Sequence, residues 1–146
     1  MMLAIGCDHG ALELKNTLIA HLEQQGYRVK DFGTYTKDSC DYPDFAVAAA
    51  RAVAAGDCEK GIVLCTTGIG VSICANKIPG IRCALLSDEL SARMTREHND
   101  TNMMALGAGV VTPEFALRLV DIWLNTPFSG EERHIRRIQK VTALDD

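Results

Sequence analysis

A cysteine followed by a glycine-rich turn is the part of this 146-residue chain best suited to chemistry. Residues 61–65 form an apolar, β-branched run typical of a buried parallel strand, and residues 71–77 are typical of a helix. The thiol of Cys65 therefore stands at the carboxyl end of a strand, just before a helix N-terminus. Unpaired N–H groups and the helix dipole favour an anion at such a place, and they favour a thiolate over a thiol.

The turn after this cysteine differs from the common phosphate-binding loops. Gly68 and Gly70 begin like a dinucleotide fingerprint, but Ile73 stands at the third glycine position, so NAD is not indicated. A Walker loop needs a glycine directly before its lysine, whereas Asn76 precedes Lys77. Two interpretations remain open: an anion site beside a reactive sulfur, and a tight turn with a buried structural cysteine.

The composition indicates a globular protein without a nucleic-acid or membrane partner. With 47% hydrophobic residues, 23% charged residues and a net charge of −4, the chain has no electrostatic reason to bind nucleic acid or a membrane surface. No apolar run approaches the length of a transmembrane helix. The six cysteines contain no C-x-x-C pair, which argues against a zinc site or a disulfide framework and favours a reducing cytoplasm.

Strand and helix patterns alternate along the whole chain. Strands are predicted at residues 2–6, 27–32, 61–65 and 81–86, with a short fifth strand within 102–111. Helices are predicted from residue 14 to the glycine at 26, and at 44–55, 71–77, 88–98 and 113–125, the last with Trp123 as a core anchor. This alternation predicts a single α/β domain over residues 1–146, a Rossmann-like, doubly wound αβα sandwich with a parallel sheet of about five strands.

The final stretch, residues 131–144, is a basic helix with a narrow apolar stripe formed by Ile135, Ile138 and Val141. The sandwich is complete without this helix. The helix can pack on its own domain or lie across a partner subunit, and a solvated face is the commoner role of such a segment.

Three polar clusters are predicted at or after the carboxyl ends of strands: Asp8-His9, residues 65–72 and residues 98–100. Because parallel strands end at one edge of a sheet, we expect the clusters to converge there into an acid–base site. Each cluster also has a plainer interpretation, such as Asp8 capping the next helix. A Cys–His hydrolase and a thiolate base acting next to a carbonyl both remain possible.

Six short motifs occur in the order expected for one family of sugar-phosphate isomerases. They are GCDH at 6–9, DYP at 41–43, C-x-TG-x-G-x-S at 65–72, ANK at 75–77, HNDTN at 98–102 and the arginines at 133 and 137. Together they resemble the ribose-5-phosphate isomerase B family, which includes galactose-6-phosphate isomerase subunits. The resemblance implies interconversion of ribose 5-phosphate and ribulose 5-phosphate through an enediolate, without a metal or an organic cofactor.

The resemblance also implies a role for each site residue. Cys65 is the expected base, Thr67 and the backbone of residues 68–72 hold the enediolate, and His98 with Asp8 opens the furanose ring. The expected substrate-binding residues are His9, Tyr42, Thr66, Gly68, Ile69, Gly70, Val71, Ser72, Asn99, Arg133 and Arg137, of which His9 and the two arginines bind the phosphate. The family's site lies between subunits, so a homodimer or a dimer of dimers is expected, with His98 and the arginines reaching a neighbour's cysteine.

Two positions depart from the family pattern. Thr66 replaces a usual glycine and is expected to alter the turn or narrow the pocket floor. Gly109 stands where many relatives carry a phosphate-binding arginine, so either Arg93 or Arg136 replaces that contact or the pocket accepts a longer sugar. The alternatives are therefore an isomerase of a six-carbon aldose phosphate, such as allose or galactose 6-phosphate, a non-catalytic sugar-phosphate-binding subunit, and a thiol redox protein.

Overall fold

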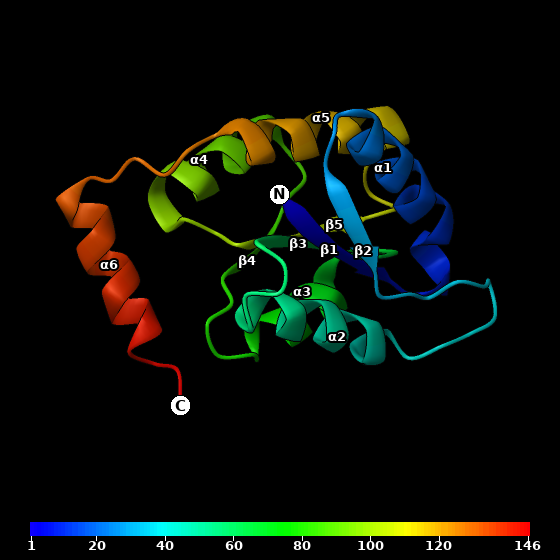
Figure 1. Cartoon of the computed structure of the whole chain (residues 1–146), viewed down its shortest axis with the longest axis horizontal. Coiled ribbons are helices and arrows are strands. Elements are labelled where there is room, and N and C mark those ends of the chain that lie inside the picture. Colours follow the sequence, from blue (N-terminus) through cyan, green and yellow to red (C-terminus); the bar gives the residue numbers. More distant parts are fainter.

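A five-stranded, wholly parallel sheet forms the centre of the computed structural model, which describes residues 1–146 (Figure 1). The strands are β1 (Met2–Cys7), β2 (Arg28–Asp31), β3 (Lys60–Cys65), β4 (Cys83–Leu85) and β5 (Met103–Gly107), in the spatial order β2-β1-β3-β5-β4. The helices are the short η1 (His9–Ala11), α1 (Leu12–Gln24), α2 (Tyr42–Ala54), α3 (Ile69–Asn76), α4 (Glu89–Asn99), α5 (Pro113–Asn125) and α6 (Glu132–Thr142). No helix has both the length and the apolar character needed to span a membrane.

Helices cover both faces of the sheet, as the sequence predicts for a doubly wound sandwich. Helices α1, α4 and α5 pack on one face through a core of leucines that includes the fully buried Trp123. Helices α2 and α3 pack on the other face through smaller side chains, mostly the alanines of α2. The indole Nε1–H of Trp123 donates to Thr101 Oγ1 at 3.0 Å, which satisfies its one buried polar atom. The prediction that Trp123 anchors the core is confirmed.

Burial explains the pattern along each strand. Strands β1, β3 and β5 are covered on both faces and are apolar along nearly their whole length. At one edge of the sheet, β2 alternates between exposed and half-buried residues. At the other edge, β4 is only three residues long, shorter than the predicted span of 81–86. A short edge strand limits pairing with other chains.

The sheet changes winding direction between β1 and β3, because β2 lies on one side of this pair and β5 and β4 lie on the other. Ligands of open α/β sheets bind outside the carboxyl ends of the strands at such a switch point. The residues that follow β1 and β3 are therefore placed at the crevice most favourable for a ligand.

Helix α6 lies outside the sandwich, beside α4 (Figure 1). Of its side chains only that of His134 is buried, while Ile135 and Val141 are exposed. The core of the domain is complete without this helix.

Candidate functional site

Cys65 is the last residue of β3, and its side chain is nearly buried, with 6% of its surface exposed. Gly68 donates its backbone N–H to the Cys65 Sγ atom at 3.1 Å. Gly68 adopts a left-handed conformation, with φ of 77°, and a Cβ atom there would lie 2.6 Å from Leu85 Cδ1. Only glycine fits this turn, and the turn directs a hydrogen-bond donor at the sulfur. This hydrogen bond fixes the position of the sulfur at the start of α3.

Asp8 lies across the switch point from Cys65, directly after the neighbouring strand β1. Its backbone N–H donates to Leu64 O at 3.2 Å, which ties it to β3. Its carboxylate accepts the N–H of Gly10 at 3.0 Å and so caps η1, while 9% of the residue remains exposed. Cys65 and Asp8 are thus held at the same end of adjacent strands.

His9 and Tyr42 extend the site along the carboxyl edge, the boundary of the sheet formed by the carboxyl ends of its strands. The Nδ1 atom of His9 accepts the N–H of Cys40 at 3.3 Å, so we assign its proton to Nε2, which is available to donate to a ligand. The ring of Tyr42 packs on the first turn of α3, where a Cβ on Gly70 would lie 2.6 Å from its Cε1 atom. Both side chains are exposed at this edge.

The turn between β3 and α3 is held by its own hydroxyl groups. Thr67 Oγ1 accepts the N–H of Ile69 at 3.3 Å, and Ser72 Oγ donates to Ile69 O at 2.7 Å. Val71 is buried beneath this turn. The N–H of Ile69 is therefore occupied, whereas the N–H groups of Gly70 and Val71 have no carbonyl partner and remain free for a developing oxyanion.

Thr66 lies between two glycines, Gly10 and Gly109. A Cβ on Gly10 would lie 2.4 Å from Thr66 Oγ1, and one on Gly109 would lie 3.1 Å from Thr66 Cγ2. The backbone N–H of Gly109 donates to Thr66 O at 2.8 Å. The two positions that depart from the family pattern therefore contact each other, and the threonine side chain occupies space that these glycines leave free.

His98 and Asn99 lie at the amino edge, the boundary of the sheet formed by the amino ends of its strands and opposite to the carboxyl edge. The predicted convergence of three clusters within one chain is therefore wrong. The two residues end α4, which begins at the carboxyl edge and runs back across the sheet to the amino end of β5. Gly61 and Met103 pair at that amino end, whereas Cys65 pairs with Gly107 at the other. The five residues of β5 separate the two edges by roughly 15 Å.

Helix α6 forms the outer wall of a cavity at this amino edge. The ring of His134 stacks on that of His98, with 4.3 Å between centroids, and its Nδ1 atom lies 2.8 Å from Ser129 Oγ. At the other end of the helix, Asp145 Oδ2 accepts the N–H of Gly80 at 2.8 Å. The cavity is open to solvent and has a volume of about 780 Å³.

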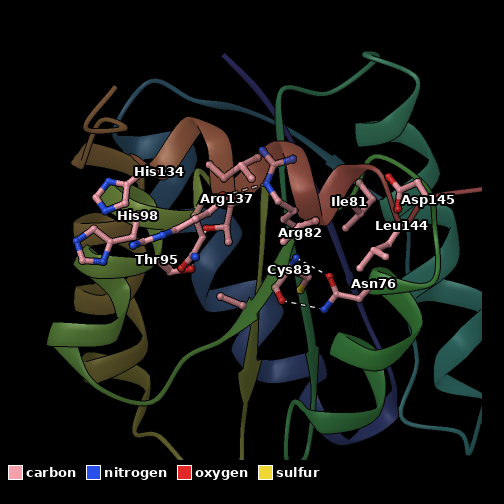
Figure 2. Close-up of a pocket in the computed structure, with 15 residues that line it drawn as sticks. Asn76, Ile81, Arg82, Cys83, Thr95, His98, His134, Arg137, Leu144 and Asp145 are labelled. Carbon is pink, nitrogen blue, oxygen red and sulfur yellow. Dashed lines mark hydrogen bonds between the residues drawn. The ribbon is translucent and has the colours of Figure 1, made fainter. Parts of the chain in front are cut away.

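Positive and titratable groups line this cavity (Figure 2). Arg82, His98, His134 and Arg137 all lie on its wall. Arg137 is exposed and makes no ion pair or hydrogen bond within the chain, whereas the nearby Arg133 pairs with Glu131. Burial lowers the pKa of His134, and the facing His98 lowers it further. The unpaired guanidinium of Arg137 makes the cavity suited to an anion.

Other cysteines lack the environment of Cys65. Cys7 is fully buried, and burial raises its pKa to about 11 despite the opposing effect of Lys15. All six cysteines are free thiols. No group of three or more His, Cys, Asp and Glu side chains is arranged to hold a metal ion.

Sequence reasoning did not identify Arg82 and His134 as parts of the site. His134 contacts His98 from a helix more than thirty positions away, and no local pattern marks such a contact. Arg82 follows a glycine turn at the start of an apolar strand. Only its charge could have indicated from the sequence that it belongs to the site.

Comparison with known proteins identifies close relatives over nearly the full length. The model of the family described as Ribose/Galactose Isomerase matches residues 3–141. The protein named ribose-5-phosphate isomerase B of Escherichia coli strain K12 is 44% identical over 143 residues, covering 98% of this chain and 95% of the relative. The solved structure of ribose-5-phosphate isomerase B from Clostridium thermocellum matches with a TM-score of 0.97 and 49% identity, covering 99% and 97% of the two chains. The corresponding structure from Mycoplasma genitalium, which holds ribulose-5-phosphate, matches with a TM-score of 0.92 and 37% identity over 97% and 94%.

Proposed function

This chain belongs to the ribose/galactose isomerase family and interconverts ribose 5-phosphate and ribulose 5-phosphate, and we propose that it does so with Cys65 as the base in a site shared by two chains. The relatives named for ribose 5-phosphate match over nearly their full length, so a six-carbon substrate and a non-catalytic subunit are not favoured. The free thiols agree with a cytoplasmic location, which we include in the proposal.

In the proposed reaction, the Cys65 thiolate removes the proton from C2 of the open-chain aldose. The electron pair of that C–H bond forms the C1–C2 double bond, and the carbonyl oxygen becomes an enediolate oxygen. The N–H groups at the start of α3 stabilise this oxygen, and Thr67 holds the sugar beside them. The thiol then returns the proton to C1, while the proton of the O2 hydroxyl moves to O1 and leaves a ketone at C2. Electrons and protons balance between the sugar and the Cys65 thiol, so the isomerisation consumes no oxidant or reductant.

The phosphate and the sugar ring need groups from both edges of the sheet. His9 at the carboxyl edge donates from Nε2, while Arg133 and Arg137 supply charge at the amino edge. Asp8 and His98, proposed for ring opening, lie on opposite edges as well. One chain therefore carries two half-sites that its own sheet keeps apart.

A second copy of the chain brings the two half-sites together when it docks along the edge strand β4. The carboxyl half-site lies toward one end of this edge and the α6 cavity lies toward the other. A two-fold axis perpendicular to β4 makes the strands of the two copies antiparallel. It therefore places the Cys65 end of one chain against the His98 end of the other. The same operation creates two equivalent sites in each dimer.

Exposed apolar side chains mark the same edge. Ile69 and Ile73 lie one turn apart on α3, Leu90 and Met94 lie one turn apart on α4, and Leu85 stands on β4 between the two helices. Apolar side chains gathered along one edge are typical of a subunit interface. The exposed Ile135 and Val141 of α6 supply a complementary surface.

The observation that carries the mechanism is the hydrogen bond from the Gly68 N–H to the Cys65 sulfur at the switch point. The direct test is to supply purified protein with ribose 5-phosphate and to measure ketose formation. We expect a higher kcat/KM for ribose 5-phosphate than for allose 6-phosphate measured side by side. A preference for the hexose would change the substrate and leave the mechanism in place, whereas no turnover of either sugar would refute the proposed chemistry.

A further inference from the structure

Arg82 joins three elements that meet at the amino edge of the sheet. Its Nε–H donates to Asn99 O at 2.9 Å and its Nη2–H donates to Asp100 O at 2.8 Å. Its backbone N–H donates to Asn102 Oδ1 at 2.9 Å, just before β5. The acceptor carbonyls belong to the end of α4, where they have no intrahelical donor. The positive charge of the guanidinium also complements the negative end of the helix dipole.

The end of α4 is conformationally demanding. Asp100 has a φ of 44° and is the only residue other than glycine with a positive φ, an arrangement that persists only when its surroundings hold it. A second arginine, Arg96, donates to Asp100 Oδ1 at 2.8 Å and to Thr101 O at 2.7 Å. Arg96 is 6% exposed, and it also donates to Thr126 O at 3.1 Å.

The two arginines have different surroundings. Arg96 lies inside the fold, where its loss would disturb the junction of α4, β5 and the segment after α5. Arg82 lies on the wall of the α6 cavity together with His98 and Arg137 (Figure 2). The carbonyls that Arg82 holds follow His98 directly in the chain. The ring of His134 packs against that of His98, and Arg82 holds the two carbonyls that follow His98 in the chain.

We propose that Arg82 is a positioning residue for sugar-ring opening, acting through His98 by holding the last turn of α4. This inference rests on the proposed function, in which His98 opens the furanose ring. Two charge-assisted hydrogen bonds hold the turn, and a displacement of about 1 Å in a catalytic group can cost about a hundredfold in rate. The later proton transfer at Cys65 takes place at the carboxyl edge and does not depend on the hydrogen bonds that Arg82 makes.

The experiment compares a substrate that must open its ring with one that has no furanose ring. Ribose 5-phosphate is cyclic, whereas D-erythrose 4-phosphate cannot close a furanose because its O4 carries the phosphate. For Arg82→Gln we expect kcat on ribose 5-phosphate to fall about ten- to hundredfold, with turnover of the tetrose phosphate within about twofold of wild type. Arg82→Lys should recover part of the loss, since an ammonium can donate to the same carbonyls without the planar fork.

Arg28→Gln is the matched control, because it removes an exposed guanidinium from β2 at the far edge of the sheet. It should leave both substrates unaffected. Equal losses on both substrates in Arg82→Gln would overturn the inference, as would a rise in KM alone, which would make Arg82 a direct ligand of the phosphate. If Arg82→Gln does not fold, the ratio of the two activities in Arg82→Lys decides the matter by the same criteria.

His98→Asn serves as the reference in the same assay. If His98→Asn separates the two substrates and the Arg82 variants do not, the inference about Arg82 fails while the proposed function stands. If His98→Asn itself does not separate them, the role proposed for His98 in ring opening is wrong, and the inference about Arg82 is refuted with it.

Discussion

The two edges of the sheet are built in different ways. At the carboxyl edge, one continuous turn from Cys65 to Ser72 supplies the sulfur, the N–H donors and the hydroxyls, and short-range hydrogen bonds hold it. At the amino edge, the ring of His134 packs on His98 and Arg82 donates to the carbonyl of Asn99, so contacts between distant parts of the chain build this edge. The first half-site is therefore preorganised by local backbone geometry, and the second by long-range packing. Variants at the two edges should fail in different ways.

Cys65→Ala should produce the largest loss, because it removes the proposed base while the backbone turn remains. Alanine fits the space of a nearly buried cysteine, so we expect a folded protein that still binds the sugar phosphate. Isomerisation of ribose 5-phosphate should fall by about 10²–10⁴-fold or more, the usual cost of losing a general base. Steady-state kinetics with circular dichroism as the folding control measures this. Near-normal turnover would show that another group moves the proton.

His98→Asn should produce the next largest loss, and only on a substrate that must open its ring. Asparagine keeps a polar side chain beside His134 but cannot exchange a proton near neutral pH. We expect kcat on ribose 5-phosphate to fall about a hundredfold, with a much smaller change on D-erythrose 4-phosphate. Parallel kinetics on the two substrates tests the assignment, which equal losses would contradict.

Mixing variants from the two edges tests whether the half-sites come from different chains. Cys65→Ala damages the carboxyl half-site and Arg137→Ala damages the amino half-site. In a two-fold dimer formed from an equal mixture, about one quarter of the sites combine two intact halves. Activity should therefore recover toward about a quarter of wild type after subunit exchange, verified by mass spectrometry of tagged chains. If each chain held a whole site, verified exchange would restore nothing.

The sequence predicts the carboxyl edge better than the amino edge, for a physical reason. The turn at residues 65–72 uses neighbouring residues, so glycine spacing and an apolar strand were enough to locate it. The cluster at His98 was placed at the wrong edge because it precedes a strand rather than following one, and α4 returns the chain across the sheet. The family resemblance supplied the proposed roles of these residues, which their spacing alone left open.

The hydrophobic periodicity of the sequence also does not predict which charged side chains are buried. Lys15 lies within a helix that periodicity predicts, yet its side chain is fully buried. Its ammonium group donates to Asp31 Oδ1 at 2.7 Å and to Thr34 O at 2.5 Å, contacts that exist only once β2 and the loop after it are in place. A buried lysine needs such partners, and those partners are set by tertiary structure.

Lowering the pH should have a smaller effect, on the stability of the fold, through His134 at the amino edge. Because burial and the facing His98 lower the pKa of His134, the folded protein binds a proton there less readily than the unfolded chain. Stability should therefore be lost as the pH falls through the unfolded value, near 6.5. Arg133 and Arg137 act in the same direction, and Glu131 opposes them.

His134→Phe should remove this dependence while keeping a ring against His98. We expect the urea midpoint of wild type to fall more than that of the variant between pH 7.5 and pH 5.5. Hydrogen exchange in α6 should increase over the same range in wild type but not in His134→Phe. The Arg28→Gln variant, altered at the far edge, should follow wild type. An identical acid response in His134→Phe would assign the effect to other groups.

The smallest effect should come from the contact between Thr66 and Gly109 at the carboxyl edge. A Cβ at position 109 would lie 3.1 Å from both Thr66 Cγ2 and Thr66 O, which is tighter than ordinary contact, so Gly109→Ala must displace the residue that follows Cys65. We expect kcat/KM to fall by about two- to fivefold in this single variant. In a Thr66→Gly background the clash with Cγ2 is gone and only the clash with the carbonyl remains, so the same alanine should cost less. Kinetics of the four proteins in this double-mutant cycle give the coupling directly. Strict additivity would show that Thr66 and Gly109 affect catalysis independently despite their contact, and that the backbone beside Cys65 absorbs the added methyl group without moving the sulfur.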